Sequence, residues 1–127
     1  MKRVGDDLSG FSTDYDAEVG AVRVSAWGFW SASVSEAFMQ AVSDACRSSP
    51  KGAQMLLDMT DLKPLREEGQ RAFGGLVGCL RELGVSRTTV TTASHLTKLQ
   101  LLRLVAEYAP KEPIEFTPTD VDFRKAR

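Results

Sequence analysis

The sequence predicts an α/β domain built on a mixed β-sheet, and three observations support this prediction. Residues 53–59 and 85–93 have the apolar character of buried strands, and an amphipathic helix between them completes a βαβ crossover. Two alternating segments precede this unit and predict an antiparallel hairpin. A further helix and a short strand follow it. The predicted order is ββαβαβαβα, with about four helices packed on the sheet.

The chain begins with a polar segment. Residues 1–10 predict a flexible N-terminal lead, and residues 11–127 are long enough for one domain with its own core. Within that domain, residues 11–15 and 21–27 alternate between apolar and polar side chains. A turn at residues 16–20 joins them, so we expect these segments to pair as the hairpin.

The first helix follows the hairpin directly. Apolar residues recur at intervals of three and four from Val34 to Cys46, which predicts one buried helix face. Ser31 or Ser33 can cap its N-terminus. The strand at residues 53–59 is nearly continuously apolar, which is typical of a central strand that is covered on both faces.

The second helix carries an apolar stripe from Ala72 to Leu83, and Gly84 is expected to end it. Three glycines interrupt this helix, and each lowers its propensity by about 1 kcal/mol relative to Ala. We expect close packing, against the sheet or against another chain, to explain them. These residues are Gly74, Gly75 and Gly78.

The third helix, residues 95–108, is apolar over most of its circumference, and this predicts burial on two sides. Pro110 ends it, and residues 114–117 supply a short edge strand. A final short helix is expected to begin at Pro118 and to run through Phe123.

Composition excludes several classes of function. The chain has 16 Lys and Arg residues against 17 Asp and Glu residues, so its net charge of −1 gives no reason to expect nucleic-acid binding. No segment resembles a membrane span or a secretory signal. Cys46 and Cys79 lack metal or redox spacing and are expected to be reduced and free of a disulfide. We therefore expect a cytoplasmic protein.

Three segments carry a resemblance to a known family. A strand ends in glycine and continues into a turn at residues 26–31, and a second strand closes on Asp, a small polar residue and an apolar residue at residues 57–62. A helix ends in Leu-Gly and leads to a Val at residues 83–85. Their order and spacing resemble the STAS domains, which include the bacterial anti-sigma-factor antagonists. The resemblance covers residues 19–123 and implies a STAS-like fold and a non-catalytic regulatory role in protein binding.

The chain departs from this family at the switch position. The family turn typically reads Asp-Ser-Ser-Gly, and a partner kinase phosphorylates a Ser or Thr there. The corresponding residues are Arg66, Glu67, Glu68 and Gly69. Because no hydroxyl is present, the phosphorylation switch is not carried over. The two glutamates either favour the first turn of a helix through its dipole or form a permanently acidic partner surface.

We predict a partner-binding surface where the two central strands end, since open α/β sheets present working residues there. Its residues are Phe29, Trp30, Lys63, Arg66, Glu67 and Glu68. The aromatic residues either plug the top of the core or form a recognition patch. The resemblance implies an unidentified protein partner, such as a kinase-like or sigma-regulatory protein. Self-association through the second or third helix is a further interpretation.

Other chemistry has weaker support in the sequence. Thr60 is the nearest remaining hydroxyl, and it fits a turn residue better than a phosphosite. His95 stands alone beside Ser94, which is a helix cap, and the chain shows no metal, nucleotide or cofactor motif. Asp58 and Asp61 are expected to bond backbone amides. We therefore expect a non-enzyme without cofactors. The alternative is a carrier or sensor of a small apolar ligand, as in Sec14-like proteins, with a pocket under the aromatic residues.

Overall fold

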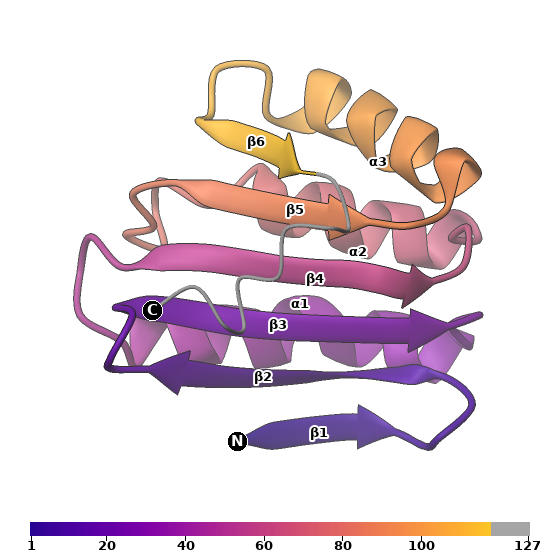
Figure 1. Ribbon diagram of the computed structural model, residues 1–127, viewed down its shortest axis with the longest axis horizontal. Coiled ribbons are helices and arrows are strands. Elements are labelled where there is room, and N and C mark those ends of the chain that lie inside the picture. Colours follow the sequence, from indigo (N-terminus) through magenta and orange to yellow (C-terminus); the bar gives the residue numbers. More distant parts are fainter. Residues whose placement is uncertain (118–127) are drawn as a thin grey trace.

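The computed structural model describes residues 1–117, in which six strands form one sheet and three helices pack on it (Figure 1). The strands are β1 (Lys2–Gly5), β2 (Gly10–Asp16), β3 (Ala21–Gly28), β4 (Gln54–Leu62), β5 (Thr88–Thr92) and β6 (Ile114–Thr117). The helices are α1 (Ala32–Arg47), α2 (Glu67–Val77) and α3 (His95–Tyr108). None of these helices is long and apolar enough to cross a membrane.

The strands lie in the sheet in the order in which they occur along the chain. β1, β2 and β3 pair antiparallel, whereas β3, β4, β5 and β6 pair parallel, so the predicted mixed sheet and its N-terminal hairpin are confirmed. Each crossover adds a strand on the same side, and right-handed crossovers then place the helices on one face. Figure 1 shows α1 and α2 behind the sheet. The parallel strands therefore end along one edge, which we call the carboxyl edge.

Two differences from the predicted element order occur near the chain ends. Residues 2–5 were expected to belong to a flexible lead, but they form β1, which pairs with β2 from Lys2 to Gly5. The strand is stabilised by this pairing and by Val4, which packs against the core. Residues 1–117 contain three helices, and the fourth predicted helix, from Pro118, lies outside the described residues.

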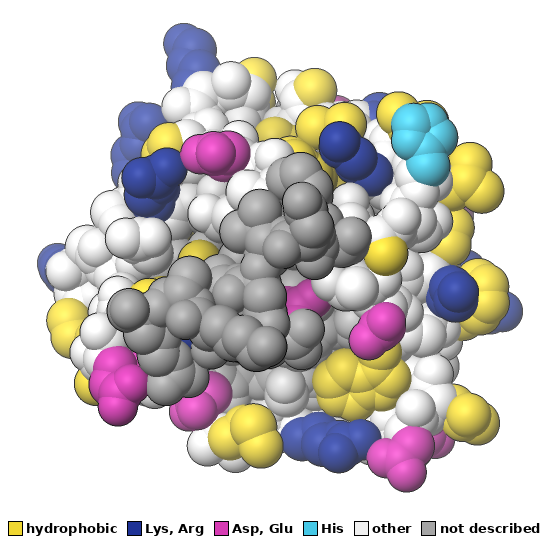
Figure 2. Space-filling model, in the orientation of Figure 1, with side chains coloured by type: hydrophobic (Ala, Val, Ile, Leu, Met, Phe, Trp, Pro, Cys, Tyr) yellow, Lys and Arg dark blue, Asp and Glu magenta, His cyan; other side chains and the backbone are white. Residues whose placement is uncertain are grey.

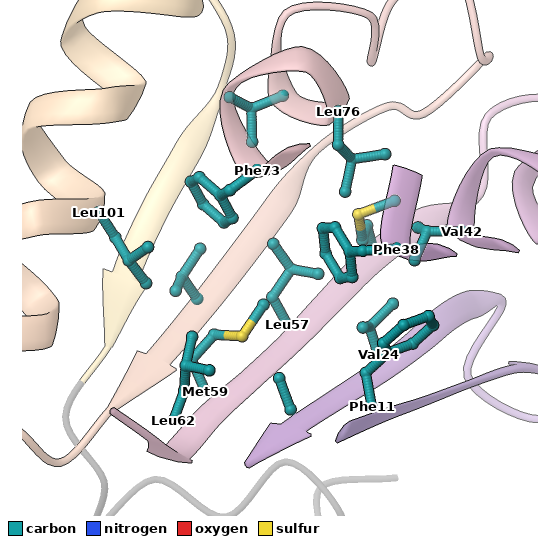
Figure 3. Close-up of a cluster of buried hydrophobic side chains, with 14 of the residues drawn as sticks. Phe11, Val24, Phe38, Val42, Leu57, Met59, Leu62, Phe73, Leu76 and Leu101 are labelled. Atoms are coloured by element: carbon teal, nitrogen blue, oxygen red, sulfur yellow. The ribbon is translucent and has the colours of Figure 1, made fainter. Parts of the chain in front are cut away.

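The core lies between the sheet and the helix layer (Figure 3). In β4, Met55, Leu57 and Met59 are fully buried. Leu56, whose side chain points to the opposite face, is also buried, which explains the continuous apolar run of this strand. Side chains from every layer complete the core, among them Val24, Phe38, Val42, Phe73, Leu76 and Leu101.

Three aromatic rings fill one end of this core. Phe38 of α1 meets Phe11 of β2 edge-on, with ring centroids 5.3 Å apart, and it meets Trp30 at 4.7 Å. Trp30 Nε1 donates a hydrogen bond of 2.9 Å to the carbonyl oxygen of Gly10. The polar atom of the buried indole is therefore satisfied, and the ring is held between the sheet and α1.

Local signals set the bounds of α1 and α2. Of the two candidate caps for α1, the structure uses Ser31, whose Oγ accepts a hydrogen bond from the Val34 amide. The prediction that α2 continues to Gly84 is wrong, because the helix ends at Val77 and turns follow. Glycines at the end of the helix weaken its last turn. Leu80 is nevertheless buried after the helix has ended.

The glycines of α2 allow close contact with both neighbouring helices. A β-carbon on Gly74 would lie 2.5 Å from the ring of Tyr108 in α3, and one on Gly75 would lie 3.0 Å from the sulfur of Met39 in α1. Close packing is thus confirmed at Gly74 and Gly75, but the prediction that the sheet or another chain is the neighbour is wrong. The neighbours are helices of the same chain.

Replacing Gly74 by alanine is expected to lower the free energy of unfolding by about 1–3 kcal/mol, because the new methyl group meets the Tyr108 ring. In the matched change Gly75→Ala, the new methyl group meets only the flexible end of Met39. The higher helix propensity of alanine should then dominate and raise the free energy of unfolding by up to about 1 kcal/mol. Urea unfolding followed by circular dichroism measures both variants. Two changes of the same sign and size would contradict this account of α2 packing.

α3 has the predicted bounds but not the predicted burial. Thr97, Leu101 and Leu104 are buried against the rest of the protein. On its other side Leu96 and Leu99 are 69% and 49% exposed. The prediction of burial on two sides is therefore wrong, because within residues 1–117 α3 is the last helix of its layer and has a neighbouring helix, α2, on one side only.

Candidate partner-binding edge

Two backbone segments leave the sheet side by side at the carboxyl edge. The Lys63 amide donates a hydrogen bond of 3.1 Å to the carbonyl oxygen of Gly28, which joins the residue after β4 to the last residue of β3. Phe29 follows Gly28, and its side chain is 63% exposed. Trp30 is only 3% exposed, so its predicted place on the partner-binding surface is wrong. It plugs the core, as the alternative interpretation of the aromatic residues expected.

The segment between β4 and α2 is fixed to α3 through one side chain. Gln100 accepts a hydrogen bond of 2.6 Å from the Leu65 amide and donates one of 2.9 Å to the Leu65 carbonyl oxygen. Leu65 is buried, whereas Lys63 and Arg66 on either side of it are exposed. Neither of these basic side chains forms an ion pair within residues 1–117.

The first turn of α2 carries both predicted glutamates at the positive end of the helix dipole. Glu67 pairs with Arg71 at 2.7 Å, whereas Glu68 forms no ion pair in the part of the chain that the structure describes. Arg66 occupies the N-cap position without a side-chain hydrogen bond. Helix stabilisation accounts for both glutamates, and the pairing leaves Glu68 as the one available to a partner.

Five of the six predicted surface residues therefore share the carboxyl edge. We call this set the edge surface, and it consists of Phe29, Lys63, Arg66, Glu67 and Glu68. In Figure 2 the right-hand side, where the parallel strands end, shows hydrophobic side chains interspersed with basic ones. The sheet topology brings these residues together, because β3 and β4 are parallel neighbours.

Sequence reasoning missed two exposed residues that adjoin this surface. Leu96 and Leu99 lie in the first turns of α3, which starts from the carboxyl edge after β5. Gln100, next to Leu99 in the chain, is bonded to Leu65, so this end of α3 lies against the segment that carries Lys63 and Arg66. The sequence does show that α3 is apolar over most of its circumference, but all of these apolar residues were expected to be buried in the core.

The remaining candidate residues have local structural roles. Asp58 Oδ1 accepts a hydrogen bond of 3.2 Å from the Thr60 amide, as expected of a carboxylate that bonds backbone. Thr60 lies within β4 where its register with β3 shifts, so the prediction of a turn residue is wrong. Asp61 is exposed beside Trp27 of β3.

The serine, histidine and cysteine side chains that were considered for catalysis or metal binding are a helix cap, an exposed residue and two free thiols. Ser94 caps α3 by accepting a hydrogen bond from the Thr97 amide, and His95 is exposed at the first position of the helix. Burial raises the pKa of the Cys46 thiol to about 11, so this cysteine is protonated at neutral pH. Cys46 and Cys79 are both free. No group of three metal-ligating side chains occurs among residues 1–117.

Comparison with known proteins supports the fold. A solved structure of an uncharacterised protein of the DUF3478 family from Shewanella loihica PV-4, described as having a SpoIIAA-like fold, is similar to this chain with a TM-score of 0.64. The two chains are 15% identical, and the similarity covers 97% of this chain and 96% of the other. The SpoIIAA-like fold is that of the STAS domains, so the predicted STAS-like fold is confirmed. No protein-family model and no curated protein matches the chain.

Proposed function

We propose that this chain is a non-catalytic regulatory module that binds a protein partner through the edge surface. The observation that carries the proposal is the exposure of Phe29, a large aromatic side chain that is 63% exposed and follows Gly28, whose carbonyl oxygen is bonded to the Lys63 amide. Aromatic residues are enriched at binding hot spots, where burial against a partner removes their apolar area from water.

Hydrogen bonds hold the backbone that carries the edge surface in place. Phe29 is held between Gly28, which is bonded to Lys63, and Trp30, which is anchored in the core. Gln100 fixes the Leu65 backbone on both its amide and its carbonyl group. A backbone that is already ordered loses little conformational entropy on association, so more of the contact energy appears as affinity.

The charges of the edge surface suggest the chemistry of the partner. Lys63 and Arg66 are exposed cations without ion pairs in residues 1–117, and Glu68 is an exposed anion without one. A partner that fits would place an apolar pocket over Phe29 and carboxylates opposite the two cations. Glu68 would then supply permanently the negative charge that phosphorylation supplies in the STAS family.

Within residues 1–117, the place where the apolar-ligand alternative expects its pocket does not support it. Its pocket was expected under Phe29 and Trp30. The Trp30 ring lies 5.9 Å from that of Phe11 and 4.7 Å from that of Phe38, so aromatic side chains fill this part of the protein. A carrier site of this kind would need a cavity of about 300 Å³ or more.

The proposal is tested by isolating the protein that co-purifies with the chain and measuring its affinity for purified variants. Phe29→Ala is expected to raise Kd by about 5- to 30-fold, because it removes the aromatic anchor at the centre of the contact. Lys63→Glu is expected to raise Kd further by reversing a charge that faces the partner. Titration calorimetry gives both values.

The matched control for the charge reversal is Lys51→Glu. Lys51 is also an exposed lysine, but it precedes β4 and so lies at the end of the strand opposite Lys63. Its reversal should leave Kd unchanged. Wild-type affinity in both Phe29→Ala and Lys63→Glu would reject the edge surface, and wild-type affinity in Glu68→Gln would reject the permanent acidic switch alone.

A further inference from the structure

A second site lies on the sheet face opposite the helices, beyond the edge surface. A cavity of about 580 Å³ opens between the β1–β2 loop and the ends of β3 and β4. In Figure 2, hydrophobic, acidic and basic side chains meet at the lower right, over the β1–β2 loop of Figure 1. The cavity is lined by Met1, Arg3, Asp7, Leu8, Ser12, Trp27, Gly28 and Asp61.

The indole of Trp27 forms a fixed wall of this cavity. Its Nε1 donates a hydrogen bond of 2.8 Å to the carbonyl oxygen of Asp6. The Asp6 side chain in turn accepts hydrogen bonds from the amides of Leu8 and Ser9, at 2.9 and 3.1 Å, which folds the β1–β2 loop. The Ser9 and Leu8 amides lower the pKa of Asp6 and favour its ionised form. The loop and the indole therefore hold each other in place.

A cation of the protein already lies over this ring. The guanidinium carbon of Arg3 is 5.0 Å from the centre of the Trp27 ring, and Nη2 of the same side chain is 2.9 Å from Asp7 Oδ1. An aromatic face with an adjacent carboxylate is the usual environment for an organic cation. The Arg3 side chain is 50% exposed and that of Asp7 is 97% exposed, so water weakens this ion pair and a ligand can displace it.

A second carboxylate of the cavity comes from β4, the strand next to β3. Asp61 is the register partner of Trp27 across β3 and β4, and it lines the same cavity. Its side chain forms no ion pair or hydrogen bond within residues 1–117, in contrast to Asp7. The cavity thus offers an aromatic face, one weakly paired carboxylate and one carboxylate that has no partner among the described residues.

We propose that this cavity binds a small organic cation, bearing a guanidinium or quaternary ammonium group, over the Trp27 ring and between Asp7 and Asp61. The bound cation takes the place of the Arg3 guanidinium, which swings into solvent on its flexible stem. The cavity volume of about 580 Å³ falls within the range of about 300–1,000 Å³ that is typical of small-molecule sites. This site does not depend on the protein-binding role of the edge surface.

Titration with tetramethylammonium chloride, at ionic strength held constant with NaCl, tests the proposal. The two indole N–H resonances are followed by NMR and assigned with Trp27→Phe. We expect the Trp27 signal to shift and saturate, while the signal of the buried Trp30 stays in place and reports that the core is intact. Asp61→Asn should weaken binding by about two- to fivefold.

Arg3→Ala provides the sharpest outcome. Because it removes the internal competitor, it should strengthen tetramethylammonium binding by about two- to fivefold. Lys2→Ala removes a neighbouring exposed cation that does not line the cavity, so it should leave the affinity unchanged. Arg3→Gln repeats the measurement with a longer side chain should the alanine variant lose its fold. An unmoved Trp27 signal, or weaker binding in both Arg3 variants, would overturn the proposal.

Discussion

Replacing Phe38 by alanine is expected to lower the free energy of unfolding by about 3–5 kcal/mol. Phe38 is fully buried and contacts two other aromatic rings of the core, with centroids 5.3 Å from Phe11 and 4.7 Å from Trp30. Truncation removes the apolar area of the side chain and leaves a cavity between α1 and the sheet, which the two flanking rings cannot fill because Trp30 is held by its hydrogen bond to Gly10. Urea unfolding at 25 °C, followed by tryptophan fluorescence and circular dichroism, measures the change.

Phe29→Ala is the matched control, since it deletes the same side chain from the carboxyl edge. Phe29 is 63% exposed, so its removal should change stability by no more than about 0.5 kcal/mol. The same variant is the main test of partner binding, and a small stability effect would allow any loss of affinity to be attributed to the contact itself. Equal destabilisation by the two variants would show that Phe29 belongs to the core.

The different fates of Phe29 and Trp30 could not be predicted from the sequence. Along β3, buried and partly buried side chains alternate through Val24 and Ala26, and this pattern is visible in the sequence. Gly28 then adopts a positive φ of 74°, which breaks the alternation. Which of the two following aromatic residues turns inward depends on the space left by Phe11 and Phe38, and that space is a property of the packed structure.

Long elements with periodic patterns were predictable, whereas short edge elements were not. The hairpin, α1 and α3 follow from alternation or from three- and four-residue spacing, and α3 has the predicted bounds. Only one side chain of β1, Val4, packs against the core, and the strand forms because it pairs with β2. The exposure of Leu96 and Leu99 depends on which helix is last in the layer, which local sequence does not specify.

The sequence could predict the part of the candidate site that depends only on the order and direction of the strands. Parallel neighbouring strands end at the same edge, so Phe29 and the residues from Lys63 to Glu68 were expected together and are found together. The cation cavity was not predictable, because it needs Arg3 of an unforeseen strand to meet Trp27 of a distant one. Contacts between side chains far apart in sequence carry no local signal.

Replacing Gly28 by alanine is expected to lower the free energy of unfolding by about 2–5 kcal/mol, through two effects that add. The positive φ of 74° strains any residue with a β-carbon, and the new methyl group would meet the backbone carbonyl of Leu8 in the β1–β2 loop. Backbone atoms cannot rotate away as a side chain can, so the loop itself must move. We expect the Trp27 hydrogen bond to Asp6, and with it the wall of the cation cavity, to be lost.

Gly52→Ala separates the two effects. Gly52 also has a positive φ, at 87°, but a β-carbon there would meet no atom within 4 Å. Its replacement should therefore show the backbone strain alone, about 1–2 kcal/mol. Urea unfolding gives both free energies, and the Trp27 indole resonance should move only in Gly28→Ala. If both variants lost the same free energy of unfolding and the Trp27 resonance did not move, the β1–β2 loop would have to shift without cost. The close approach of Leu8 to Gly28 would then not position the carboxyl end of β3.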